Sequence, residues 1–172
     1  MIVAYRDRSP SEVRDIYYVR RENGKWSAPR AIHEDGWEIT ACPVNGPSIA
    51  ADGRRVALAW YTEAQDRPRV QIAFSPDAGA TFGKPVQVDD GQPVGRVDVL
   101  MLADGSALVC WLSGTMEKGA IKVRRVRADG TLDAISTVAE TDLARQSGFP
   151  AWRGLEIKLY SHGRNSVKPH AC

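Results

Sequence analysis

Charged and aromatic side chains gather in the predicted loops between short β-prone runs of this sequence. Arginine can bind a carboxylate through two parallel hydrogen bonds, and tryptophan can cover the face of a sugar ring in a pocket. This mixture therefore indicates a binding site for an acidic carbohydrate. The candidate ligand-binding residues are Arg6, Asp7, Trp37, Tyr61, Glu63, Arg67, Arg96 and Asp98. Loops are also polar simply because they are solvated, so both interpretations stay open.

One pair among these candidates could do covalent chemistry. Tyr61 and Glu63 are two residues apart, so on a strand they lie on the same face. A tyrosine activated by a neighbouring carboxylate can act as a nucleophile. A tyrosine at the end of a strand is also common packing, so the sequence assigns no catalytic residue.

An eight-residue turn sequence separates two alternating β-prone runs, residues 69–74 and 85–88. An aspartate in such a turn can accept hydrogen bonds from backbone N–H groups, and a glycine can take a positive φ. The phenylalanine can fold back onto the hairpin. The defining positions are Ser75, Asp77, Gly79, Thr81 and Phe82.

The chain repeats itself with a period of about 50 residues, which is typical of propeller blades of four short strands. Residues 56–61 are matched by residues 107–112, so that Trp60 corresponds to Trp111, and Tyr5 occupies the same place further upstream. We predict a single all-β domain over residues 1–161, followed by a polar tail at 162–172. Its antiparallel blades are predicted at 1–33, 46–89, 96–140 and, in part, 147–161. Trp60, Trp111, Val56, Leu58 and Leu108 are expected to be buried between blades.

The turn over residues 75–82 resembles the Asp-box, or BNR repeat, of the sialidase superfamily of β-propellers. The resemblance implies a six-bladed ring, of which this chain supplies three to four blades. It also implies a chemistry with an arginine triad, a tyrosine nucleophile assisted by a glutamate, and an aspartic acid/base. No arginine of this sequence matches the triad by its motif, so no catalytic residue is carried over.

Three functions follow as hypotheses. The first is a sialidase-like propeller protein that binds acidic glycans without hydrolysing them. The second is a non-catalytic propeller segment for assembly or protein interaction, and the third is an exo-sialidase-type glycoside hydrolase. The blade count favours a homodimer that closes a six-bladed ring, with residues 147–161 against residues 2–7 of the other copy.

Composition excludes several other partners. The net charge is +2, which gives no electrostatic basis for binding nucleic acid. No apolar stretch is long enough to span a membrane, and no secretory signal is present, so the compartment stays undetermined, although the resemblance suits an extracytoplasmic protein. The three cysteines and three histidines form no metal-binding spacing, and neither a metal nor a cofactor is expected.

Overall fold

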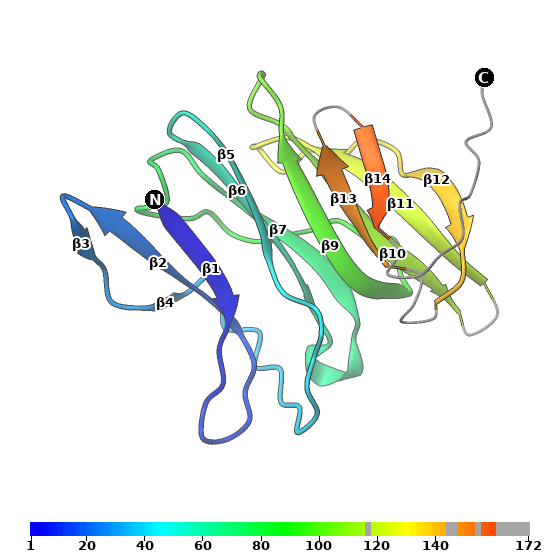
Figure 1. Cartoon of the computed structure of the whole chain (residues 1–172), viewed down its shortest axis with the longest axis horizontal. Coiled ribbons are helices and arrows are strands. Elements are labelled where there is room, and N and C mark those ends of the chain that lie inside the picture. Colours follow the sequence, from blue (N-terminus) through cyan, green and yellow to red (C-terminus); the bar gives the residue numbers. More distant parts are fainter. Residues whose placement is uncertain (116–117, 144–147, 154–155, 161–172) are drawn as a thin grey trace.

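The computed structural model describes residues 1–115, 118–143, 148–153 and 156–160, and these residues form an all-β protein. Three antiparallel four-stranded sheets and one strand pair follow one another along the chain (Figure 1). The first sheet contains β1 (Ile2–Arg6), β2 (Ile16–Glu22), β3 (Lys25–Trp26) and β4 (Arg30–Ala31), with both β3 and β4 paired to β2. The second contains β5 (Ser48–Asp52), β6 (Arg55–Thr62), β7 (Arg69–Ser75) and β8 (Val86–Gln87), in that order.

The third sheet repeats the order of the second. It contains β9 (Pro93–Met101), β10 (Ala107–Thr115), β11 (Lys118–Val126) and β12 (Ser136–Thr141), and β13 (Phe149–Arg153) pairs with β14 (Glu156–Tyr160). The only helical segment in the described ranges is the short 3₁₀ turn η1 (Ala64–Asp66). The predicted all-β class and the four-stranded antiparallel sheets are confirmed. The third sheet extends slightly beyond the predicted limits of 96–140, because β9 begins at Pro93 and β12 ends at Thr141.

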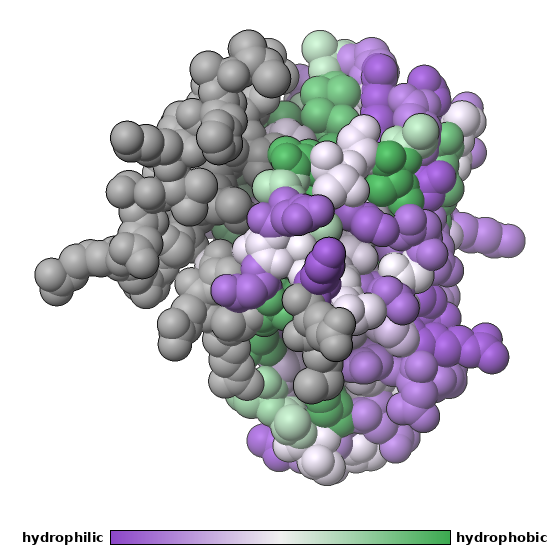
Figure 2. Space-filling model, turned by 90° about the vertical axis from the view of Figure 1, so that its right-hand side faces the viewer, coloured by the Kyte–Doolittle hydropathy of each residue, from purple (hydrophilic) through white to green (hydrophobic). Residues whose placement is uncertain are grey.

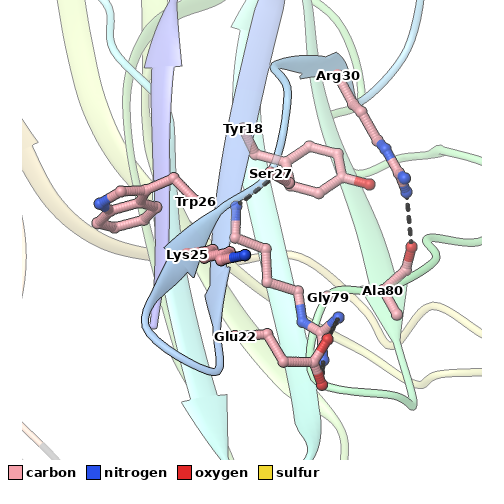
Figure 3. A pocket seen from close by; sticks show the side chains of 9 residues that line it. Tyr18, Glu22, Lys25, Trp26, Ser27, Arg30, Gly79 and Ala80 are labelled. Atoms are coloured by element: carbon pink, nitrogen blue, oxygen red, sulfur yellow. Dashed lines mark hydrogen bonds and ion pairs between the residues drawn. The ribbon is translucent and has the colours of Figure 1, made fainter.

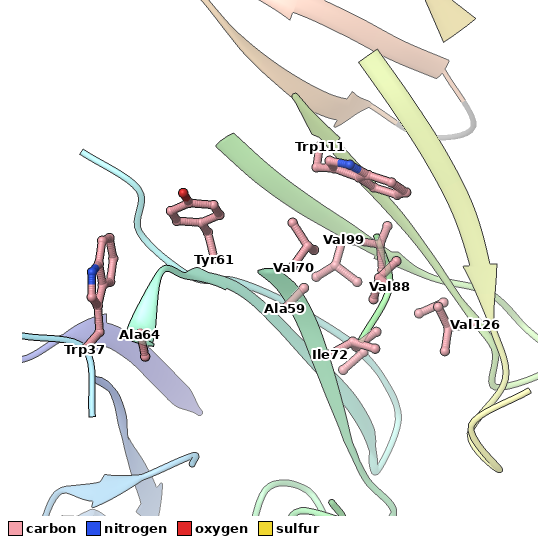
Figure 4. Packing of buried hydrophobic residues seen from close by; sticks show 13 residues of the cluster. Trp37, Ala59, Tyr61, Ala64, Val70, Ile72, Val88, Val99, Trp111 and Val126 are labelled. Carbon is pink, nitrogen blue, oxygen red and sulfur yellow. The ribbon is translucent and has the colours of Figure 1, made fainter. Parts of the chain in front are cut away.

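The central strand β6 is buried on both faces, which explains its nearly continuous apolar sequence. Because side chains alternate along a strand, Leu58 and Trp60 pack with Ile16 of the first sheet. Ala57, Ala59 and Tyr61 point the other way and belong to a second cluster with residues of the third sheet (Figure 4).

The large side chain of each central strand points back to the preceding sheet. Trp60 packs toward the first sheet, and Trp111 of β10 packs in the cluster shared with the second sheet. Both tryptophans, like Val56 and Leu58, are almost completely buried, as expected from the sequence. Leu108 is only half-buried, and the expectation that it is buried is wrong. Because side chains alternate along β10, Leu108 lies on the face opposite to Trp111. The neighbour of that face is the pair β13–β14, which has only two strands.

The buried polar atom of Trp60 has a partner from a distant part of the chain. Its indole N–H donates to the carboxylate of Asp35 at 2.7 Å, and the amide of Gln71 donates to the same carboxylate at 3.1 Å. Burial raises the pKa of Asp35. This carboxylate therefore supplies acceptors to two side chains on the face of the second sheet that the first sheet covers.

The side of the molecule that the third sheet forms is largely hydrophilic where it is described. Hydrophobic side chains there are gathered in separate patches rather than in one continuous area (Figure 2). No described helix is long and apolar enough to cross a membrane.

The turn of residues 75–82 is organised by the carboxylate of Asp77. One carboxylate oxygen accepts from the Ser75 hydroxyl at 2.8 Å and from the Thr81 N–H at 2.9 Å, and the other accepts from the Thr81 hydroxyl at 2.7 Å. These hydrogen bonds hold the pKa of Asp77 well below its usual range. The aromatic ring of Phe82 then packs edge-on against Tyr18 of the first sheet, with 5.0 Å between ring centroids.

We predict that Asp77→Ala lowers the melting temperature by about 3 °C at neutral pH, because the turn loses the acceptors for three donors. Asp77→Asn keeps one carbonyl oxygen and is expected to lose about half as much. The folded-state pKa is depressed, so the difference from the wild type should be present above pH 4 and shrink as the pH falls below it. Differential scanning fluorimetry from pH 3 to 7 measures this, and an unchanged melting temperature at pH 7 would contradict it.

Candidate functional site

A pocket opens at the end of the second sheet, where η1, the connection before β5 and the start of β9 meet. Its volume is about 410 Å³. We call it the connection pocket. It is lined by Trp37, Ile39, Cys42, Pro43, Val44, Asn45, Tyr61, Glu63, Pro68, Pro93 and Val94. Three of the sequence-predicted site residues, Trp37, Tyr61 and Glu63, are therefore brought together here.

The aromatic pair in this pocket comes from two distant segments. Tyr61 lies near the end of β6, and Trp37 lies in the segment between β4 and β5. Their rings pack edge-on, with 5.7 Å between the ring centroids (Figure 4). Burial and the adjacent Glu63 carboxylate raise the pKa of Tyr61 above its ordinary value. The phenol is therefore protonated at neutral pH. In that state it is a hydrogen-bond donor rather than an activated nucleophile.

Arg6 stacks on the ring of Trp37, with its guanidinium carbon 4.7 Å from the ring centroid. Its N–H groups donate to the carbonyl oxygens of Asn45 at 2.9 Å, Arg14 at 2.5 Å and Tyr61 at 2.7 Å. Burial lowers the pKa of Arg6 to about 10, which still leaves it charged at neutral pH. The sequence predicts Arg6 as a ligand-binding residue. In the structure, its guanidinium instead joins the first sheet to β6 and to the segment that precedes β5.

Two buried aspartates near this site carry no signal in the sequence pattern. Asp15 accepts the backbone N–H groups of Gly36 at 3.0 Å and Trp37 at 3.1 Å, and so holds the indole in place. Asp35 binds Trp60, as described above. The hydrogen-bond partners of each lie more than 20 residues away along the chain, so local turn chemistry could not have identified either aspartate as a positioning residue.

Arg96 and Asp98 lie at the next junction, between the third sheet and β13, and neither lines the connection pocket. The Asp98 carboxylate accepts from the Ser48 hydroxyl at 2.5 Å and from the Trp152 N–H at 2.7 Å. Arg96 donates to the Gly148 carbonyl at 2.6 Å and stacks on Phe149 at 5.2 Å. Like Arg6, these side chains join neighbouring sheets.

The remaining two candidates also lie outside the pocket lining. The backbone N–H of Asp7 donates to the carbonyl of Asp15 at 3.0 Å, at the start of the β1–β2 loop. Arg67 is exposed just after η1 and precedes Pro68, which does line the pocket. Asp7 and Arg67 thus lie in loops as predicted, whereas Arg6, Arg96 and Asp98, which were also expected in loops, lie on β1 and β9. Sequence reasoning could not separate lining side chains from their neighbours.

The connection pocket is lined mostly by uncharged side chains. Glu63 is the only acidic side chain among the lining residues, and it is exposed. The Tyr61 hydroxyl and the Asn45 amide add hydrogen-bonding groups, while Trp37 and the prolines supply apolar surface. Within the described ranges no cluster of three or more histidine, cysteine or acidic residues could hold a metal ion. Such a lining suits the hydroxyl and amide groups of an uncharged ligand better than a carboxylate.

Comparison of the sequence with protein-family models and with curated proteins finds no match. The site is therefore interpreted from its own geometry.

We predict that Arg6→Met lowers the free energy of unfolding by about 3 kcal/mol, because three carbonyl oxygens lose a charged donor. Arg6→Lys keeps the charge but not the planar fork, and is expected to lose about half of that. Urea unfolding followed by tryptophan fluorescence measures both. A stable Arg6→Met protein with impaired ligand binding would instead make Arg6 a binding residue.

Proposed function

We propose that this chain is a sialidase-like β-propeller segment that binds an uncharged part of a glycan in the connection pocket and does not hydrolyse it. The observation that carries the proposal is the convergence of Trp37, Tyr61 and Glu63 in one pocket. A partly apolar wall next to a few placed hydrogen-bonding groups is the usual composition of a small-ligand site.

Support for the propeller architecture comes from the repetition of the sheets. The second and third sheets have the same strand order, and each turns the tryptophan of its second strand toward the sheet before it. Repeated units that bury their faces only against their neighbours are the principle of propellers and related repeat folds.

Two features speak against hydrolysis. A clamp for a substrate carboxylate needs arginines that are free to bind it, whereas Arg6 is occupied by three backbone carbonyls. A tyrosine nucleophile needs a phenol that ionises readily, whereas the surroundings of Tyr61 raise its pKa. Binding without turnover is thus the function that this geometry supports.

The binding test uses isothermal titration calorimetry of the whole chain with N-acetylglucosamine, galactose and sialyllactose. We expect a neutral sugar to bind, and Glu63→Gln or Tyr61→Phe to weaken its binding about tenfold, which corresponds to 1.4 kcal/mol. Glu22→Gln, a change of the same kind at the opposite end of the strands, should leave this affinity unaltered. Release of the fluorophore from a sialoside substrate, abolished by Tyr61→Phe, would show that the chain is a hydrolase.

An assembly function is also favoured by one specific observation, the open outer face of the first sheet. Val3 and Tyr5 pair across strands with Val19 and Tyr17, so that all four lie on the face directed away from the second sheet. Val3 is 45% exposed, although the equivalent faces of the second and third sheets are completely covered around Trp60 and Trp111. Exposed apolar faces of this kind are typical of interfaces.

We propose that a second copy of the chain covers this face. Within one chain, each sheet packs against the sheet that follows it. The same kind of contact between two copies would place β13 and β14 of one copy on the first sheet of the other. Within the described ranges β1 pairs only with β2, so its other edge is open to a strand of a second copy. Two copies related by a two-fold axis would use this contact twice.

The homodimer predicts a mass in light scattering of about twice the 18.9 kDa of one chain. Val3→Arg should yield a monomer of unchanged circular dichroism, because a charge would be buried in the interface. Val138→Arg is the matched control, since Val138 is a similarly exposed valine, 50% exposed, on β12. A monomeric wild-type protein, or equal effects of the two variants, would contradict the dimer.

A further inference from the structure

A second pocket lies at the opposite end of the strands, between the first sheet and the turn of residues 75–82. Its volume is about 340 Å³. We call it the basic pocket. It is lined by Tyr18, Arg20, Glu22, Lys25, Trp26, Ser27, Arg30, Gly79 and Ala80. None of the sequence-predicted ligand-binding residues belongs to it.

The strand register explains why charged side chains meet here. Tyr18, Arg20 and Glu22 alternate along β2 and so lie on one face. Lys25 is the cross-strand partner of Glu22, and Arg30 is the cross-strand partner of Tyr18, which places both cations on that same face (Figure 3).

The positive charges of this pocket exceed the negative ones. Arg20 forms a two-pronged ion pair with Glu22, with both N···O distances at 3.0 Å. Lys25 and Arg30 have no acidic partner among the residues that the structure describes. The guanidinium of Arg30 donates to the Ala80 carbonyl at 3.3 Å, so the turn orients it without neutralising it. Two uncompensated cations therefore face one pocket.

The two aromatic residues of the pocket do not form a joint stacking platform. Tyr18 is only 6% exposed because Phe82 packs against it. Trp26 is the cross-strand partner of Arg21 and is 48% exposed, and its ring points away from Tyr18 (Figure 3). A nucleic-acid strand, whose successive bases stack on several aromatic rings, is thus a poorer occupant than an anion with hydroxyl groups.

We propose that the basic pocket binds a tetrahedral oxyanion carried by a carbohydrate, as in a sulfate or phosphate monoester of a sugar. The ammonium of Lys25 and the planar fork of Arg30 approach from two strands, which suits an anion with acceptor oxygens in several directions. The side chain of Glu22 is 61% exposed at the rim, where its oxygen atoms, like the amide oxygen of a glutamine, can accept sugar hydroxyls. This inference does not rest on the connection pocket, which shares no residue with the basic pocket.

The wall of the basic pocket is the Asp-box-like turn itself, so its shape is fixed by the hydrogen bonds of Asp77. Gly79 has φ of +78°, and a Cβ built on it would lie 2.3 Å from the Ile2 side chain. The backbone of Gly79 and Ala80 therefore approaches the first sheet more closely than a residue with a side chain would permit. This close approach brings the Ala80 carbonyl within reach of Arg30.

Calorimetric titrations at constant ionic strength test the proposal with glucosamine 6-sulfate, glucose 6-phosphate and uncharged glucose. The charged sugars should bind more tightly than glucose, and the two esters reveal which oxyanion is preferred. The double variant Lys25→Gln/Arg30→Gln should weaken binding of the charged sugar at least tenfold. The matched control Arg54→Gln/Lys84→Gln removes two exposed cations outside the pocket and should leave the affinity unchanged.

A third variant tests whether the charge of the pocket, rather than an indirect change of structure, controls binding. Glu22→Gln removes the one carboxylate of the pocket and releases the fork of Arg20, so binding should become about threefold tighter. Equal losses in the two double variants would overturn the proposal, as would equal binding of glucose. Tighter binding of a thymidine oligonucleotide than of either ester, lost in Lys25→Gln/Arg30→Gln, would instead assign the pocket to nucleic acid.

Discussion

The structure depends on the burial of β6 on both of its faces. A strand between two sheets must bury Trp60 on one side and Tyr61 on the other, together with the polar atoms that these side chains carry. Buried polar atoms need hydrogen-bond partners, and neighbouring sheets must supply them. Asp35 therefore accepts the Trp60 indole N–H, and Arg6 binds the carbonyl oxygen of Tyr61.

This requirement decides which charged residues remain available for a ligand. Arg6, Arg96 and Asp98 each connect one sheet with the next through backbone or side-chain groups. Side chains that do not join sheets, such as Glu63 in the connection pocket, remain available to bind a ligand.

The two ends of the strands consequently differ in chemistry. The connection pocket combines aromatic and apolar surface with a single carboxylate. The basic pocket combines the cations Lys25 and Arg30 with one exposed aromatic side chain, Trp26. A glycan with neutral and esterified sugars could be held by one molecule at both ends, and the two sets of variants separate these contributions.

The sequence by itself determined the strands, their repeat and the chemistry of the turn at residues 75–82, because alternation, turn residues and spacing act over short distances. It also located the loops that carry Trp37 and Glu63 and the strand that carries Tyr61. Only the tertiary structure decided that Arg6 and Asp98 join sheets, that Leu108 is half-buried, and that Lys25 and Arg30 share a pocket. These roles depend on cross-strand register and on contacts between sheets, which link residues far apart along the chain, and no local pattern encodes such partners.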